Sequence, residues 1–75
     1  MIEPTVGSVW QDMAPRCPGR TFRVDAITVR AGVDGAVCTI LTNVEGAVTD
    51  RRGQRTTINL GRFTAANYRL IREAP

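Results

Sequence analysis

The chain has 75 residues, 43% of them hydrophobic and 23% charged, and a formal net charge of +3. A chain of this length forms one domain with one modest core, which leaves little room for a deep substrate cavity. The composition excludes extensive disorder, and no apolar run approaches the roughly 18 residues that a membrane span needs. Residues 1–4 lack the basic and apolar parts of a secretory signal, so we expect a cytoplasmic protein without a membrane partner.

The residue types that carry most catalysis and metal binding are missing or isolated. The chain contains no histidine and two cysteines, Cys17 and Cys38. Without histidine a nucleophile lacks its commonest general base, and two sulfurs supply at most half of a zinc site. The acids fall mostly in predicted turns, and no phosphate-binding glycine motif occurs. The sequence therefore predicts a protein that is not an enzyme and needs no cofactor or metal, with both cysteines in structural roles.

Glycine, proline and Asx residues divide the chain into pieces of strand length, which is typical of a small all-β domain. The first predicted strand is 6–10, and the turn formers after it predict a loop over 11–19. The second and longest predicted strand is 20–30. Its apolar positions change parity near Asp25, which indicates a β-bulge, because one extra residue turns all later side chains to the other face.

The next segments continue the all-β pattern. Residues 31–35 end in Asp-Gly, a strong hairpin signal, and the nearly continuous apolar run at 36–42 predicts a central strand. Residues 43–53 are polar and show no periodicity, which predicts an exposed, mobile loop. The clean alternation of apolar and polar residues at 55–60 predicts the fourth strand.

The end of the chain completes the predicted domain. Residues 61–66 form a segment short enough for a single helical turn, and 68–72 form the fifth predicted strand. We therefore expect one domain over residues 6–72, with tails at 1–5 and 73–75, the second of which should fray.

The order of these elements resembles that of an SH3-like barrel, in which a 3-10 turn separates the fourth and fifth strands; residues 60–64 fit such a turn. Segments spread over nearly the whole chain are also similar to small uncharacterised proteins of actinobacteria and their phages. These segments are 6–12, 19–24, 55–58, 61–63 and 68–71. The resemblance implies an all-β fold, a small five-stranded SH3-like barrel with one 3-10 turn before the last strand. Its motifs are structural, so it implies no activity.

Arginine supplies all ten basic residues of the chain. Coding bias in a GC-rich genome is one explanation, and it agrees with the source that the resemblance implies. The other explanation is that the planar guanidinium group suits phosphate or carboxylate recognition. A net charge of +3 on so short a chain permits nucleic-acid binding without demonstrating it.

The candidate binding residues are the arginines expected on one face of the sheet and the aromatic residues beside them. They are Arg20, Arg23, Arg55, Arg62 and Arg69, with Trp10 and Tyr68. The arginines suit a phosphate backbone, and a base could stack on either aromatic ring. The same two rings could instead complete a core that has few large side chains, and outward arginines also keep small barrels soluble.

Two functions stay open from the sequence. The first is a small binding module associated with nucleic acid through its arginine-rich face. The alternative is a protein–protein interaction module, such as a phage-encoded effector that binds a host protein or a subunit that self-associates into a homo-oligomer. The alternative would use the loops at 11–19 and 43–54, because exposed loops are where small barrels place specificity.

Overall fold

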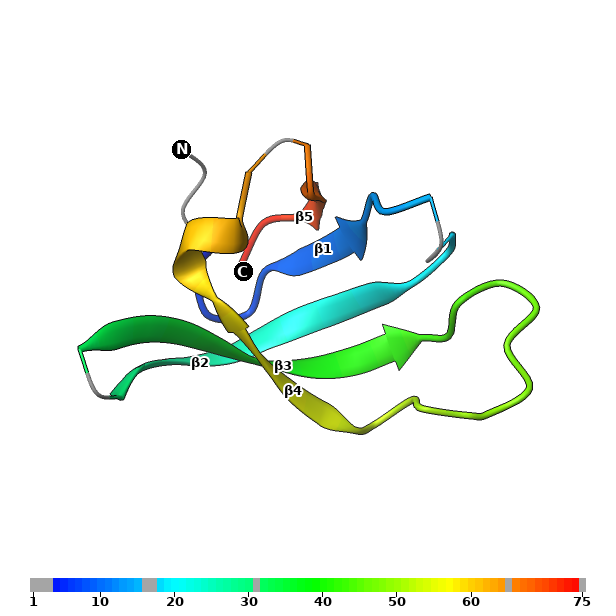
Figure 1. The fold of residues 1–75 in the computed structure, drawn as a ribbon, viewed down its shortest axis with the longest axis horizontal. Helices are drawn as coiled ribbons and strands as arrows, with labels where there is room; N and C mark the ends of the chain where they lie inside the picture. Colours follow the sequence, from blue (N-terminus) through cyan, green and yellow to red (C-terminus); the bar gives the residue numbers. More distant parts are fainter. Residues whose placement is uncertain (1–3, 16–17, 31, 65, 75) are drawn as a thin grey trace.

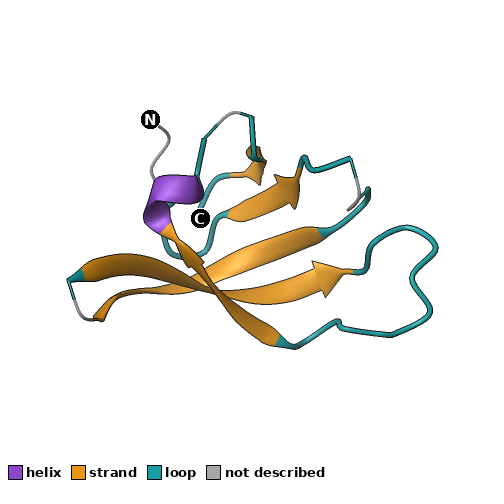
Figure 2. Cartoon of the chain, in the orientation of Figure 1, coloured by secondary structure: helices purple, strands orange, loops and turns teal. Residues whose placement is uncertain are grey.

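The computed structural model describes residues 4–15, 18–30, 32–64 and 66–74 (Figure 1). Its elements in chain order are β1 (Val9–Asp12), β2 (Thr21–Arg30), β3 (Val33–Thr42), β4 (Arg55–Asn59), the 3-10 turn η1 (Leu60–Arg62) and β5 (Tyr68–Arg72). Figure 2 shows strands and loops with this single turn of helix. The prediction of an all-β fold with five strands and a 3-10 turn before the last strand is confirmed.

The strands form one antiparallel sheet in the order β4-β3-β2-β1-β5. Among the described residues no ladder joins β4 to β5, so the sheet is open and not closed into a barrel. The predicted barrel is therefore not confirmed, and the SH3-like architecture stays a prediction. The segment that begins at η1 crosses from the β4 edge to the β5 edge of the sheet (Figure 1).

The hydrophobic core lies against one face of the curved sheet and depends on aromatic rings. Phe63, from the segment that crosses between the sheet edges, is fully buried. Its ring lies 5.3 Å from Trp10 and 5.0 Å from Tyr68, measured between centroids. Phe22 meets Tyr68 edge-on at 5.3 Å. Edge-on and tilted rings are favourable arrangements, so a chain with few aromatics places them where they contact one another.

Cys38 lies in the same core with a free thiol and no exposed surface. Burial, with a smaller contribution from the nearby Asp25 carboxylate, raises the pKa of this thiol to about 12. The thiol is thus protonated at neutral pH, as a structural cysteine should be. Cys17 lies outside the described residues.

The boundaries of several elements differ from those predicted, and the amino-terminal part of the chain differs most. β1 begins at Val9 and not at residue 6, because Gly7 has a φ of 93° and the Ser8 N–H donates to the Thr5 carbonyl oxygen in a turn. Pro4, expected in the amino-terminal tail, is buried. The packed region therefore includes residues before position 6.

The β2–β3 hairpin forms, but its turn lies before the predicted Asp-Gly pair. Gly32 takes the positive φ of 77°, whereas Asp34 and Gly35 belong to β3. A Cβ on Gly35 would lie 3.0 Å from the Thr57 methyl carbon, so this glycine permits the close approach of β4. The bulge predicted near Asp25 is confirmed by a register shift between Val24 and Ala26.

Candidate functional site

A row of directly opposed residues crosses the whole sheet, and its arginines project from the face turned away from the core, whereas Val9 within the row is 7% exposed. Arg55 of β4 lies opposite Thr39, and Thr39 lies opposite Arg23 of β2. Arg23 in turn lies opposite Val9, and Val9 lies opposite Arg72 of β5. Directly opposed residues of an antiparallel sheet project from the same face. The register therefore aligns arginines on alternate strands of the sheet.

The direction of this row follows from the neighbours of Arg23. Phe22 and Val24, on either side of it, are buried in the core, so Arg23 projects to the other face. Arg69 lies opposite Gln11, one position along β1 from the core residue Trp10, and therefore projects from the same outer face. We call Arg23, Arg55, Arg69 and Arg72 the arginine face. All of them are exposed.

Asp25 is the acidic member of this surface. Its Oδ1 atom accepts a hydrogen bond from Arg23 Nε at 2.8 Å, and its Oδ2 atom accepts one from the Thr39 hydroxyl. The pKa of Asp25 is lowered, first by the Thr39 hydrogen bond and also by Arg23 and Arg55, although burial opposes this shift. The carboxylate is therefore charged at neutral pH and holds the Arg23 side chain in place.

The predicted arginines thus divide between two sites. Arg23, Arg55 and Arg69 lie together on the arginine face, as the sequence predicted. Arg20 and Arg62 do not join them, since they line a cleft on the core side of the sheet. The cause is position in the chain: Arg20 precedes β2 and Arg62 ends η1, so strand alternation controls neither residue.

The two aromatic candidates lie in the core and not on a binding face. Trp10 is 1% exposed and Tyr68 is 5% exposed. The indole Nε1–H of Trp10 donates to the Ser8 hydroxyl oxygen at 2.9 Å, so the polar atom of this ring is also occupied. A base cannot stack on either ring in this conformation. The structure corresponds to the other interpretation of the sequence, in which these rings complete the core.

Sequence reasoning missed Arg72. Simple alternation from Arg69 places Arg72 on the opposite face, with Leu70. A register shift in the β1–β5 ladder between Val9 and Trp10 brings Arg72 opposite Val9 instead. No signal in the sequence marks this shift, because it depends on how β5 pairs with β1, which is distant in the sequence.

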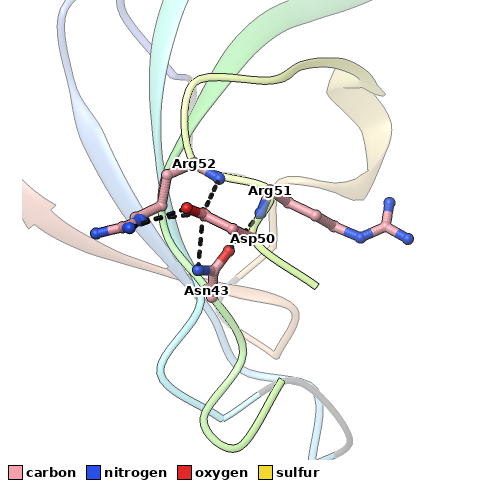
Figure 3. Close-up of polar contacts among 4 residues, drawn as sticks. All are labelled: Asn43, Asp50, Arg51 and Arg52. Atoms are coloured by element: carbon pink, nitrogen blue, oxygen red, sulfur yellow. Dashed lines mark hydrogen bonds and ion pairs between the residues drawn. The ribbon is translucent and has the colours of Figure 1, made fainter. Parts of the chain in front are cut away.

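The loop at 43–54 is exposed, as predicted, and a polar network around Asp50 connects its two ends (Figure 3). Arg52 donates to both carboxylate oxygens, from Nε at 3.0 Å and from Nη2 at 2.9 Å. The Asn43 side-chain amide donates to Asp50 Oδ1 at 3.1 Å, and its oxygen accepts from the Arg51 N–H at 2.8 Å. The Arg51 side chain points away from this network (Figure 3), and Arg51 is exposed.

We expect the network in this loop to weaken at acidic pH. The pKa of Asp50 is held well below its usual value, first by the hydrogen bond from the Arg52 side chain and next by that from Asn43. A lowered pKa in the folded state means that the stabilisation is present above the unfolded-state pKa and is lost as pH falls. The Arg52 N–H donates to Asp50 Oδ1 at 3.0 Å, and the Arg51 N–H is held through Asn43. Both N–H groups should therefore lose protection progressively as pH falls below about 4 toward the lowered pKa of Asp50.

Amide exchange measured by NMR across this pH range tests the expectation. In the Asp50→Asn variant both groups should be less protected at neutral pH, and their protection relative to the intrinsic exchange rate should not change further on acidification. Protection that stays constant in the unmodified protein as pH falls would contradict the proposed role of the carboxylate.

Comparison with known proteins finds no match: no family model matches the chain, and neither a curated protein nor a solved structure matches it. Within the described ranges no three acidic or cysteine side chains are grouped so that they could hold a metal ion. No helix in the described part of the chain is long and apolar enough to cross a membrane.

Proposed function

We propose that the chain is a non-enzymatic binding domain whose arginine face holds the phosphate backbone of a nucleic acid. The observation that supports this proposal is the alignment of Arg55, Arg23 and Arg72 in one row across alternate strands. At about 4.8 Å between strands the row extends roughly 19 Å along the sheet. Along the axis of a DNA duplex, where each strand rises about 3.4 Å per nucleotide, this length spans five or six nucleotides.

The composition of the face favours contacts to phosphates over contacts to bases. Its members are guanidinium groups, threonines and one carboxylate, and the aromatic rings that could stack on bases are buried. Guanidinium groups bind phosphate oxygens by paired hydrogen bonds and charge. Binding should therefore depend strongly on salt and weakly on base sequence.

The experiment is a fluorescence-anisotropy titration of labelled single-stranded and double-stranded DNA and RNA at several salt concentrations. The triple variant Arg23→Gln, Arg55→Gln, Arg69→Gln should weaken binding. Each lost phosphate contact on a DNA duplex removes about 0.9 from the slope of log affinity against log salt. The slope should therefore fall by between about two and three units.

A control with the same change in net charge separates the arginine face from overall charge. The triple variant Arg20→Gln, Arg51→Gln, Arg62→Gln also loses three positive charges, but none from the arginine face. It should keep most of the affinity and of the slope. Equal loss in the two triple variants would contradict the proposal. So would absence of binding at low salt, which would leave the protein–protein interaction module as the interpretation.

A further inference from the structure

A polar cleft of about 310 Å³ lies on the core side of the sheet, between β4 and the start of β5. The residues that matter for its chemistry are Asp12, Arg20, Thr57, Arg62, Asn67 and Tyr68. Neither Arg20 nor Arg62 forms an ion pair with another described residue. Two guanidinium groups thus face a solvent-accessible hollow with their hydrogen-bonding capacity free for a ligand.

The Tyr68 hydroxyl is a second donor at this cleft. The ring is 5% exposed and packs among Phe22 and Phe63, yet the hydroxyl makes no hydrogen bond to any described residue. No buried side-chain nitrogen or oxygen among the described residues lacks a hydrogen-bond partner, so the unpaired Tyr68 hydroxyl is open to the solvent of the cleft. Burial raises the pKa of Tyr68, while Arg62 and Arg20 act to lower it and Asp12 acts to raise it, which agrees with these three charged groups lying around the hydroxyl.

The free edge of β4 contributes a third donor. The Ile40 N–H donates to the Gln54 backbone carbonyl oxygen at 2.9 Å, and the Ile40 carbonyl oxygen accepts from the Gly53 N–H at 2.8 Å. Hydrogen-bonded and non-hydrogen-bonded pairs alternate along an antiparallel ladder. Ile40 and Gln54 form a hydrogen-bonded pair, so Val37 and Thr57, three positions along the ladder, form a non-hydrogen-bonded pair. The backbone N–H and C=O of Thr57 therefore point away from β3, toward the cleft that this residue lines.

We infer that this cleft binds a singly charged carboxylate group. Arg20 and Arg62 supply the charge-assisted hydrogen bonds, and the Tyr68 hydroxyl and the Thr57 N–H supply neutral ones. The Asp12 carboxylate leaves the lining with one net positive charge and repels a doubly charged phosphate monoester. Asp12 Oδ1 already accepts from the Ala14 N–H at 2.9 Å, and its Oδ2 atom can accept a hydrogen bond from an N–H or O–H group of the same ligand.

Such a carboxylate belongs either to a small free acid or to the carboxyl end of a peptide. The test is an NMR titration of the isotope-labelled protein with acetate, N-acetylglycine and inorganic phosphate at matched ionic strength. Saturable shifts of the Thr57, Asn67 and Tyr68 amides are expected with both carboxylates and at lower concentration than with phosphate. Tighter binding of N-acetylglycine than of acetate identifies a peptide end, because only N-acetylglycine offers Asp12 an amide N–H. Equal binding identifies a free acid.

Variants distinguish this cleft from the arginine face. Arg62→Gln should weaken carboxylate binding by about tenfold, the effect of losing one charge-assisted hydrogen bond. Tyr68→Phe, which keeps the ring in the core, should weaken it by a smaller factor. The matched control Arg69→Gln removes the same charge from the arginine face and should leave carboxylate binding unchanged. Absence of saturable shifts with both carboxylates, tighter binding of phosphate, or equal loss in Arg62→Gln and Arg69→Gln would overturn the inference, whatever the result with nucleic acid.

Discussion

Replacing Phe63 with alanine is expected to lower the free energy of unfolding by roughly 3–5 kcal/mol. The Phe63 side chain is fully buried, and its ring meets those of Trp10, Phe22 and Tyr68 at centroid distances of 5.3, 6.1 and 5.0 Å. A domain of this length has a total stability on the order of 4–11 kcal/mol. The substitution therefore removes a large part of it, because alanine loses the contacts of the Phe63 ring with three other aromatic rings.

Denaturant unfolding followed by circular dichroism measures this loss. Ile58→Ala, which removes an 8% exposed side chain from β4, should cost roughly 2–5 kcal/mol, and Ile40→Ala should cost about as much. Ile71→Ala is the matched control, because Ile71 is 52% exposed and its truncation should cost less than about 1 kcal/mol. If Phe63→Ala and Ile58→Ala were no more destabilising than Ile71→Ala, the described core would be incorrect.

Replacing Ser8 with alanine is expected to cost about 1–3 kcal/mol, although it removes a single oxygen atom. Ser8 is 1% exposed. Its hydroxyl donates to the Thr5 carbonyl oxygen at 2.5 Å and accepts from Trp10 Nε1 at 2.9 Å. Alanine would leave the Trp10 N–H buried without an acceptor, and an unsatisfied buried donor loses its full hydration energy.

A double-mutant cycle separates this hydrogen bond from the packing of the indole ring. Trp10→Phe removes the donor, so adding Ser8→Ala to it should cost clearly less than Ser8→Ala costs alone. The measurement is urea unfolding followed by far-ultraviolet circular dichroism. Tryptophan fluorescence cannot be used, because Trp10→Phe removes the one tryptophan of the chain. Strictly additive losses would show that the Ser8–Trp10 hydrogen bond does not contribute to stability.

Local patterns in the sequence were sufficient for the number and order of the strands and for part of the arginine face. The alternation around Ile58 and the parity change near Asp25 predicted β4 and the β2 bulge, because side-chain direction in a strand follows from residue spacing alone. The same rule predicted that Arg23 and Arg55 face away from the core. The position of the hairpin turn could not be predicted, because Gly35 serves a contact with Thr57, which is distant in the sequence.

The chain alone therefore determined the all-β class, the single 3-10 turn, the excess of arginine and the outward direction of arginines within regular strands. Tertiary structure decided which arginines meet, since the register brings Arg72 into the row and leaves Arg20 and Arg62 at the cleft. It also decided that the Trp10 and Tyr68 rings pack in the core, and that the sheet stays open between β4 and β5. The physical reason is that alternation is a local property of the backbone. Register, burial and closure depend on contacts between residues far apart in the sequence.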